Sequence, residues 1–105
     1  MSFERIMGIY VTNDDAYQKY RDGMTPILNT FGGSFGFDFK IAEVLKSKTK
    51  EPINRVFTID FPSKEAMENF FSDSSYKEVR NKHFISSVQS STVISMHEKI
   101  TKTPA

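Results

Sequence analysis

Three side chains with complementary chemistry fall at helical spacing in the last third of the chain. Tyr76, Arg80 and His83 stand at positions zero, four and seven of an expected short helix and therefore share one face. An imidazole titrates near neutral pH and can carry a proton, while a guanidinium and a phenol can hold an anionic or carbonyl group. The structural alternative is a histidine at a helix end that interacts favourably with the last backbone carbonyls. We predict that Tyr76 and Arg80 line a ligand pocket and that His83 is a candidate proton carrier.

Asp60 is the second candidate for proton transfer, and Tyr10 is a further candidate for the pocket lining. Asp60 lies near the end of an expected strand, on the same face as Thr58. In partly apolar surroundings a carboxyl group has a raised pKa and can act as a general base. Two structural alternatives stay open: an ion pair with Lys40 or Arg80, and a cap for the helix that follows the strand.

The sequence predicts neither a metal site nor a cofactor. His83 and His97 have no carboxylate nearby at helical spacing, and without cysteine there is no thiolate ligand, disulfide or cysteine nucleophile. Gly32, Gly33 and Gly36 lack the following lysine of a phosphate-binding loop, and a strand rather than a helix comes next. These glycines are therefore better explained by a helix cap.

Charge and hydropathy patterning exclude several classes of partner. With 14 lysines and arginines against 13 aspartates and glutamates, no whole-molecule field favours a nucleic acid or an anionic membrane. RNA-recognition motifs carry their stacking aromatics on the third strand after a basic residue, whereas Phe35-Gly36-Phe37 lies on the second strand and precedes Asp38. The apolar run within residues 1–11 is too short for a signal peptide or a membrane span. We expect a cytoplasmic protein with no nucleic-acid or membrane partner.

The N-terminal part of the sequence predicts first a strand and then a long helix. Residues 6–11 alternate as a strand that is largely apolar on both sides, which is typical of a central strand. Apolar residues then recur at steps of three and four, and Asn13 or Asp14 is placed to cap this amphipathic helix. Pro26 removes an amide inside the helix, so we expect a kink or a break near Gly23.

The second and third predicted strands each have an aromatic face. Alternation within residues 34–45 places four apolar residues on one face: Phe35, Phe37, Phe39 and Ile41. A polar hairpin loop follows, and residues 56–61 alternate again with an aromatic face and a mixed face. Pro62 cannot donate to a strand ladder and ends this strand, while Ser63 is suited to cap the next helix.

The last third predicts two short helical segments and a fourth strand. Ser75 and Glu78 have the spacing of a capping box, which starts the second helical segment. Residues 89–98 predict the fourth strand. We expect a single domain over residues 1–98 and a loose tail over residues 99–105.

This order of elements folds most simply as an α+β, ferredoxin-like domain, in which a four-stranded antiparallel sheet carries its helices on one face. The other face mixes apolar and polar residues, and such a face is either wet or covered by another chain. The composition has ten phenylalanines and no tryptophan, and a phenylalanine must mostly be buried in a core or an interface. We predict a homodimer formed through the sheet face.

Several short motifs follow one another in a distinctive order. They are Tyr17 with Tyr20, Pro26, Gly32-Gly33, Asp60-Phe61-Pro62-Ser63, Glu65-Ala66 and Ser75-Tyr76. In this order and spacing, over most of the chain, they resemble the family called domain of unknown function 1330, within the dimeric alpha-beta barrel superfamily. The resemblance implies two sheets that face each other across a two-fold axis and close a barrel, but it implies no function. Members usually carry an arginine where this chain has His83, and the second strand here is more aromatic.

We expect the protein to bind a small organic molecule between the sheet and the short helix, with a lining drawn from Tyr10, Asp60, Tyr76, Arg80 and His83. The first alternative is a cofactor-independent enzyme, resembling a monooxygenase or an isomerase, that acts on a carbonyl or phenolic compound. His83 or Asp60 would then move a proton and Arg80 would stabilise developing negative charge. This alternative rests on the chemistry of superfamily relatives. The second alternative is a dimerisation or regulatory module without a pocket.

Overall fold

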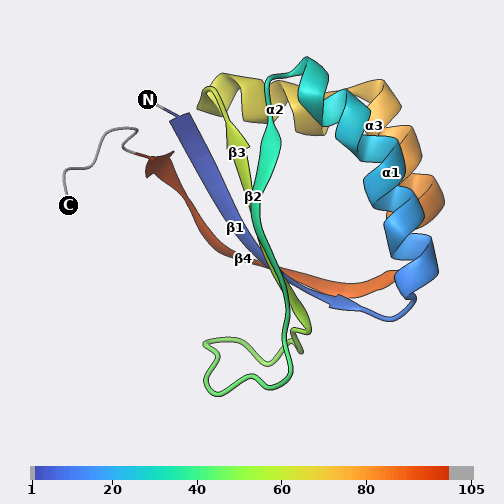
Figure 1. The fold of residues 1–105 in the computed structure, drawn as a ribbon, viewed down its shortest axis with the longest axis vertical. Helices are drawn as coiled ribbons and strands as arrows, with labels where there is room; N and C mark the ends of the chain where they lie inside the picture. The colour runs from blue at the N-terminus through green and yellow to red at the C-terminus, as the bar shows by residue number, and fades with distance from the viewer. Residues whose placement is uncertain (1, 100–105) are drawn as a thin grey trace.

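The computed structural model describes residues 2–99, which form one twisted antiparallel sheet with helices on one side (Figure 1). The elements in chain order are β1 Ser2–Val11, α1 Asp14–Thr30, β2 Ser34–Lys40, β3 Arg55–Phe61, α2 Lys64–Ser72, α3 Ser74–Val79, the π-helical turn η1 Arg80–Phe84 and β4 Val88–Lys99. The strand order β2-β3-β1-β4 puts β1 and β3 at the centre. The predicted α+β, ferredoxin-like arrangement is confirmed. Of the tail predicted over 99–105, Lys99 ends β4 and the rest lies outside the described residues.

Helix α1 begins at the expected cap and runs without interruption past its proline. The side chain of Asn13 accepts a hydrogen bond from the amide of Ala16 at 3.0 Å, which satisfies a free donor of the first turn. Of the kink or break predicted near Gly23, the break is wrong, since one helix spans Asp14–Thr30 with Pro26 inside it. Tertiary packing explains why the helix continues, because Met24 and Leu28, on either side of the proline, are buried in the core.

The end of α1 follows the Schellman pattern. Gly32 has a φ of 76° and donates its amide to Asn29 at 3.0 Å, and Gly33 donates to Leu28 at 3.0 Å. A Cβ on Gly33 would lie 2.4 Å from the Leu28 side chain, so the chain needs glycine at this close approach as well. The two glycines therefore form the helix cap that their spacing predicts.

The two central strands divide their residues between two faces of the sheet. Odd-numbered residues of β1 and β3 face the helices and join the core, which includes Phe3, Met7, Ile9, Val11, Phe57, Ile59 and Phe61. Even-numbered residues lie on the other side, which we call the open face; they include Glu4, Tyr10, Thr58 and Asp60. The aromatic and mixed faces predicted for residues 56–61 are both observed.

Strand β2 departs from simple alternation. Phe35 pairs with Ile59 and Asp38 pairs with Phe57, so two residues, Gly36 and Phe37, stand opposite Thr58 in a bulge. The prediction of one continuous aromatic face is wrong for this reason. Phe35 faces the helices, whereas Phe37 lies on the open face with Phe39. The backbone amide of Phe37 donates a hydrogen bond to the Thr58 hydroxyl at 2.8 Å. The strand also ends at Lys40, earlier than predicted.

The helical region after β3 starts as predicted and then diverges. Ser63 caps α2 by accepting from the amide of Ala66 at 3.1 Å. The cap of α3 is Asp73, whose carboxylate accepts from the amide of Tyr76 at 3.0 Å, so the capping box predicted at Ser75 is wrong. The chain then widens into η1, where the amide of Ile85 reaches back five residues to Arg80 at 3.3 Å.

Candidate functional site

A cavity of about 140 Å³ lies between the helices and the helix-facing side of the sheet. Its floor is built by alternate residues of three strands that the register places on one side: Met7, Ile9, Phe35, Phe57 and Ile59. Its roof comes from α1, α2, α3 and η1 and comprises Tyr17, Tyr20, Met24, Phe71, Tyr76 and Phe84. The remaining lining consists of Ser91 and three arginines. Apolar surface and hydrogen-bond donors therefore meet in one small space.

Two tyrosine hydroxyls meet under the helices. The phenolic oxygens of Tyr20 and Tyr76 are 2.9 Å apart and both side chains are buried. Burial raises the pKa of Tyr20, and the neighbouring Tyr76 raises it further. Burial also raises the pKa of Tyr76, although its hydrogen bond with Tyr20 and the charges of Arg80 and Arg5 oppose this. Both groups therefore stay neutral at physiological pH, and the pair can donate its one remaining hydroxyl hydrogen to a ligand oxygen.

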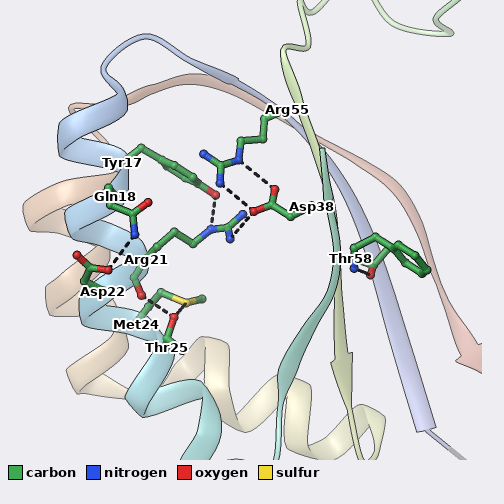
Figure 2. A network of polar contacts seen from close by, with 10 residues as sticks. Tyr17, Gln18, Arg21, Asp22, Met24, Thr25, Asp38, Arg55 and Thr58 are labelled. Atoms are coloured by element: carbon green, nitrogen blue, oxygen red, sulfur yellow. Dashed lines mark hydrogen bonds and ion pairs between the residues drawn. The ribbon is translucent and has the colours of Figure 1, made fainter. Parts of the chain in front are cut away.

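At one end of the cavity, Arg21 belongs to an ion-pair network (Figure 2). Its Nε donates to the Tyr17 hydroxyl at 2.7 Å and its Nη1 donates to Asp38 at 3.1 Å. Arg55 donates two further bonds to the same carboxylate, at 3.0 and 2.8 Å. The guanidinium carbon of Arg21 also lies 4.0 Å from the centroid of the Phe35 ring. Buried Nη2 of Arg21 has no hydrogen-bond partner among the described residues.

Asp38 holds this network together. Burial acts to raise the pKa of its carboxyl group, but hydrogen bonds from Arg55 and the charges of both arginines outweigh it, so the pKa is lowered. The same hydrogen bonds raise the pKa of Arg55. Two cations share one anion, and the cluster keeps a net positive charge beside the cavity.

At the other end, Arg5 and Arg80 form the mouth of the cavity. Both also line an adjoining surface groove of about 390 Å³, together with Lys77 and Asn81. The guanidinium of Arg5 lies 4.5 Å from the centroid of the Phe71 ring. Arg5 is partly buried, which lowers its pKa. Within residues 2–99, neither Arg5 nor Arg80 forms an ion pair with a carboxylate.

Two of the five predicted site residues, Tyr76 and Arg80, line this cavity. His83 does not, because the wider turn of η1 changes the helical phase after Arg80. The side chain that reaches the cavity at this point is Phe84, and the carbonyl of His83 accepts from the Ser87 hydroxyl at 2.7 Å. The shared face inferred from a regular helical repeat therefore ends at Arg80.

The other two predicted residues, Asp60 and Tyr10, lie on the open face. Asp60 stands across the sheet from Glu4, and the ammonium group of Lys99 lies 3.5 Å from Glu4 and 3.8 Å from Asp60. His97 completes this cluster, with its Nε2 at 2.9 Å from a carboxylate oxygen of Glu4. The structure thus divides the predicted site residues between the two faces of the sheet.

Residues 5–96 match the family model described as a domain of unknown function, DUF1330. The chain belongs to this family. No curated protein matches the sequence. The motifs that suggested the resemblance lie on α1, its cap, the end of β3, α2 and α3, and so they include both tyrosines of α1 that line the cavity.

Solved structures support the fold of this DUF1330 protein. A protein of unknown function from Rhodopseudomonas palustris is similar at a TM-score of 0.78 and 19% identity, over 96% of this chain and 84% of that one. A dabb family protein with a ferredoxin-like fold from Mesorhizobium loti has a TM-score of 0.65 and 10% identity, over 94% and 97%. A candidate antibiotic biosynthesis monooxygenase from Nitrosomonas europaea has a TM-score of 0.61 and 8% identity, over 98% and 94%. At these identities the likeness concerns the fold alone.

Two arginines that line the cavity of this DUF1330 domain, Arg5 and Arg21, were not singled out from the sequence. Arg21 directly follows Tyr20 and lies one turn after Tyr17, inside the apolar stripe of α1. A charged residue within an apolar helix face is a usable signal, because burying it requires a partner or a ligand. Arg5 gives no comparable signal, since its facing depends on the register of β1.

Two kinds of feature are absent from the described part of the DUF1330 domain. Among residues 2–99, no helix has the length and apolar character needed to cross a lipid bilayer. In the same residues, no group of three histidine, cysteine, aspartate or glutamate side chains is arranged to hold a metal ion. The cavity lining itself contains no carboxylate and no imidazole among these residues, so its polar groups are donors or neutral phenols.

Proposed function

We propose that this protein binds a small organic molecule in the cavity between the sheet and the short helical segments α3 and η1. The observation that supports this most directly is a small space with an apolar floor and a roof of buried phenols, with a guanidinium at each end. Such a combination is typical of ligand sites, in which apolar walls hold the body of the ligand and a few polar groups fix its orientation.

The polar groups indicate what the ligand must offer. Arginines only donate hydrogen bonds, and the Tyr20–Tyr76 pair has one hydroxyl hydrogen left over after the two phenols bond to each other. An acceptor oxygen on the ligand satisfies this surplus of donors. Tyr76 and Arg80 then bind that oxygen, as the sequence predicts for them.

A cofactor-independent enzyme acting on a carbonyl or phenolic compound is the second candidate. The neutral phenol pair beside Arg80 supports it, because these groups can stabilise negative charge that develops on a substrate oxygen. In this version His83 or Asp60 moves a proton. His83 precedes a lining residue by one position, whereas Asp60 must act from the open face, so His83 is the better placed of the two.

Ligand binding can be tested with small aromatic ketones, amides, phenols and acids, by thermal shift and then by titration calorimetry. Tyr76→Phe keeps the ring and removes the hydroxyl, and we expect it to weaken binding by roughly five- to tenfold, the effect of losing about one hydrogen bond. Tyr10→Phe is the matched control on the open face and should bind normally. If no compound binds, or if Tyr76→Phe and Arg80→Gln both bind like the parent, the cavity is not the site. A module without a pocket would then be the better description.

We also propose that two copies of the chain pair through the open face. Phe37 and Phe39 stack there with ring centroids 6.0 Å apart, although their side chains are 60% and 53% exposed in the single subunit. A contiguous exposed aromatic patch is typical of an interface. Light scattering should give the mass of a dimer for the parent chain and of a monomer for the double variant Phe37→Ser/Phe39→Ser. Leu45→Ser, at an exposed position in the loop after β2, is the control that should stay dimeric.

The proposal also covers the location of the protein in the cell and its domain organisation. We place the protein in the cytoplasm, which its cysteine-free composition supports. We also treat residues 1–98 as one domain, because the buried apolar residues of the described part form a single core. Fractionation of cells that express the full chain and limited proteolysis of the purified protein test these two points.

A further inference from the structure

The volume of the cavity matches a ligand body of one ring. A cavity of about 150 Å³ lined by apolar side chains is known to hold a benzene molecule, and the cavity here is of about the same size, 140 Å³. Its floor carries the rings of Phe35 and Phe57, packed edge to face at 5.7 Å between centroids. An aromatic ring makes favourable contacts with such walls. A single aromatic ring therefore matches this space.

The arginines of the chain are concentrated at this cavity. The sequence contains four of them; Arg5, Arg21 and Arg80 line the cavity, and Arg55 binds Asp38 beside it. None of the ten lysines is part of the lining among the described residues. The chain as a whole carries a net charge of only +1, so this concentration of arginines is a local feature.

The two ends of the cavity differ in how their charge is balanced. Arg21 shares the carboxylate of Asp38 with Arg55, whereas Arg5 and Arg80 form no ion pair within residues 2–99. Arg5 is partly buried and Arg80 is exposed at the mouth, where Lys77 adds a third positive charge in the adjoining groove. An anion held at this mouth gains charge-assisted hydrogen bonds and can keep part of its hydration.

From ring size and charge together, we propose that the ligand is a single-ring aromatic carboxylate. Its ring occupies the apolar floor of the cavity, and its carboxylate is bound by Arg5 and Arg80 at the mouth, beside the Tyr76 hydroxyl. This inference rests on the proposed function, because it names the class of molecule that the same cavity takes.

The test compares acids with neutral molecules of the same shape. Benzoate and phenylacetate are titrated against the full chain at pH 7, alongside benzamide and phenylacetamide, and binding is followed by calorimetry. We expect the acids to bind at least tenfold more tightly than the amides. Raising the salt concentration should reduce this preference, because it rests on charge. As a test of size, 2-naphthoate should bind at least tenfold more weakly than benzoate.

Substitutions of the arginines test where the carboxylate of the ligand binds. Arg5→Gln and Arg80→Gln should each reduce the preference for acids over amides about tenfold, while the affinity for the amides changes little. Arg80→Lys keeps the charge and should retain part of the preference. Lys82→Gln, an exposed neighbour in η1 outside the lining, is the matched control and should behave like the parent. Circular dichroism and thermal unfolding confirm that each variant is folded, and Arg80, being exposed, provides the test if Arg5→Gln unfolds.

The outcomes separate this inference from the proposed function. If the amides bind as tightly as the acids, or if Arg5→Gln and Arg80→Gln both keep the full preference, the carboxylate assignment is overturned and the cavity remains a ligand site. If 2-naphthoate binds as tightly as benzoate, the single-ring assignment is overturned. If no ring compound of either charge binds, the proposed function itself fails.

Discussion

On the helix-facing side of the sheet phenylalanines are buried, and on the open side they are exposed. Phe57 and Phe61 of β3 are 8% and 1% exposed, whereas Phe37 and Phe39 of β2 are 60% and 53% exposed. The polar groups differ in the same way. On the open face Glu4 pairs with His97 and Lys99, while on the helix-facing side donors converge on a hollow.

This difference indicates two kinds of occupant. The hollow between helices and sheet is walled by the chain itself except at its mouth and leaves donor capacity unused, as Nη2 of Arg21 shows, so it suits a small acceptor molecule. The open face presents the exposed, stacked pair Phe37 and Phe39, so it suits another protein surface. Substitutions on the two faces should therefore change different measured quantities.

The largest effect is expected for Phe70→Ala. Phe70 is fully buried and contacts the rings of Phe31, Phe61, Phe71 and Tyr76. Removing its ring should lower the free energy of unfolding by about 3–5 kcal/mol, because contacts are lost and a cavity remains. Urea denaturation measures the change. Phe37→Ala, the control on the open face, should cost less than about 1 kcal/mol in the monomer. Equal losses would contradict the contrast between the faces.

The fold could be predicted from the sequence where local pattern and tertiary packing agree. Residues 55–61 alternate cleanly, and both faces of β3 were assigned correctly. The prediction for strand β2 failed because its bulge adds a residue opposite Thr58, and alternation cannot reveal a bulge that a partner strand imposes. The helix break failed because core packing holds α1 together across Pro26. Asp73 was overlooked as the cap because Ser75 with Glu78 has an equally good capping pattern.

The second largest loss of stability is expected when the ion-pair network at one end of the cavity is broken. Asp38→Ala leaves Arg21 and Arg55 without their shared anion, and Arg21 is buried. We expect the free energy of unfolding to fall by about 2–3 kcal/mol, less than for a fully buried pair because Asp38 keeps some exposure to water. Asp22→Ala, at an exposed aspartate on α1 whose carboxylate accepts a hydrogen bond from Gln18, is the control and should cost under about 0.5 kcal/mol.

The pH dependence of stability sharpens this test. The pKa of Asp38 is lower in the folded chain than its ordinary value of 3.8, because hydrogen bonds from Arg55 and the arginine charges outweigh burial. The folded state therefore binds this proton less readily than the unfolded state, and the stabilisation is complete above about pH 4 and lost as the pH falls through the lowered pKa. The difference in stability between the parent and Asp38→Asn should shrink below pH 4. A constant difference would show that Asp38 does not titrate with the lowered pKa.

The candidate site was only partly predictable. Regular helical spacing placed Tyr76 and Arg80 on one face, and both line the cavity. The same spacing failed for His83, because a π-helical turn depends on packing that a repeat of 3.6 residues does not encode. To place Asp60 and Tyr10 correctly, one must know which face of the sheet the helices cover. The sequence pattern left this undecided because both sides of β1 are apolar.

A third and smaller effect is expected for the phenol pair. Tyr20→Phe and Tyr76→Phe each leave one buried hydroxyl without its partner, at a cost of about 1–2 kcal/mol in the free energy of unfolding. The double variant should cost less than the sum of the two, by about 1 kcal/mol, because it removes both hydroxyls together. Tyr10→Phe on the open face should be close to neutral. Additive losses would mean that the two hydroxyls do not stabilise each other.

The smallest effect is expected for His83→Ala. Its side chain lies outside the cavity lining, and the contact that holds this residue, the Ser87 hydroxyl on its carbonyl, belongs to the backbone and survives the substitution. We expect a change in unfolding free energy under about 0.5 kcal/mol and a change in benzoate affinity under about twofold. Phe84→Ala, one residue on, should weaken the same binding severalfold, because Phe84 lines the cavity. If His83→Ala weakens binding more than Phe84→Ala, the π-helical turn does not set the helical phase in solution, and the regular spacing of Tyr76, Arg80 and His83 describes the site better.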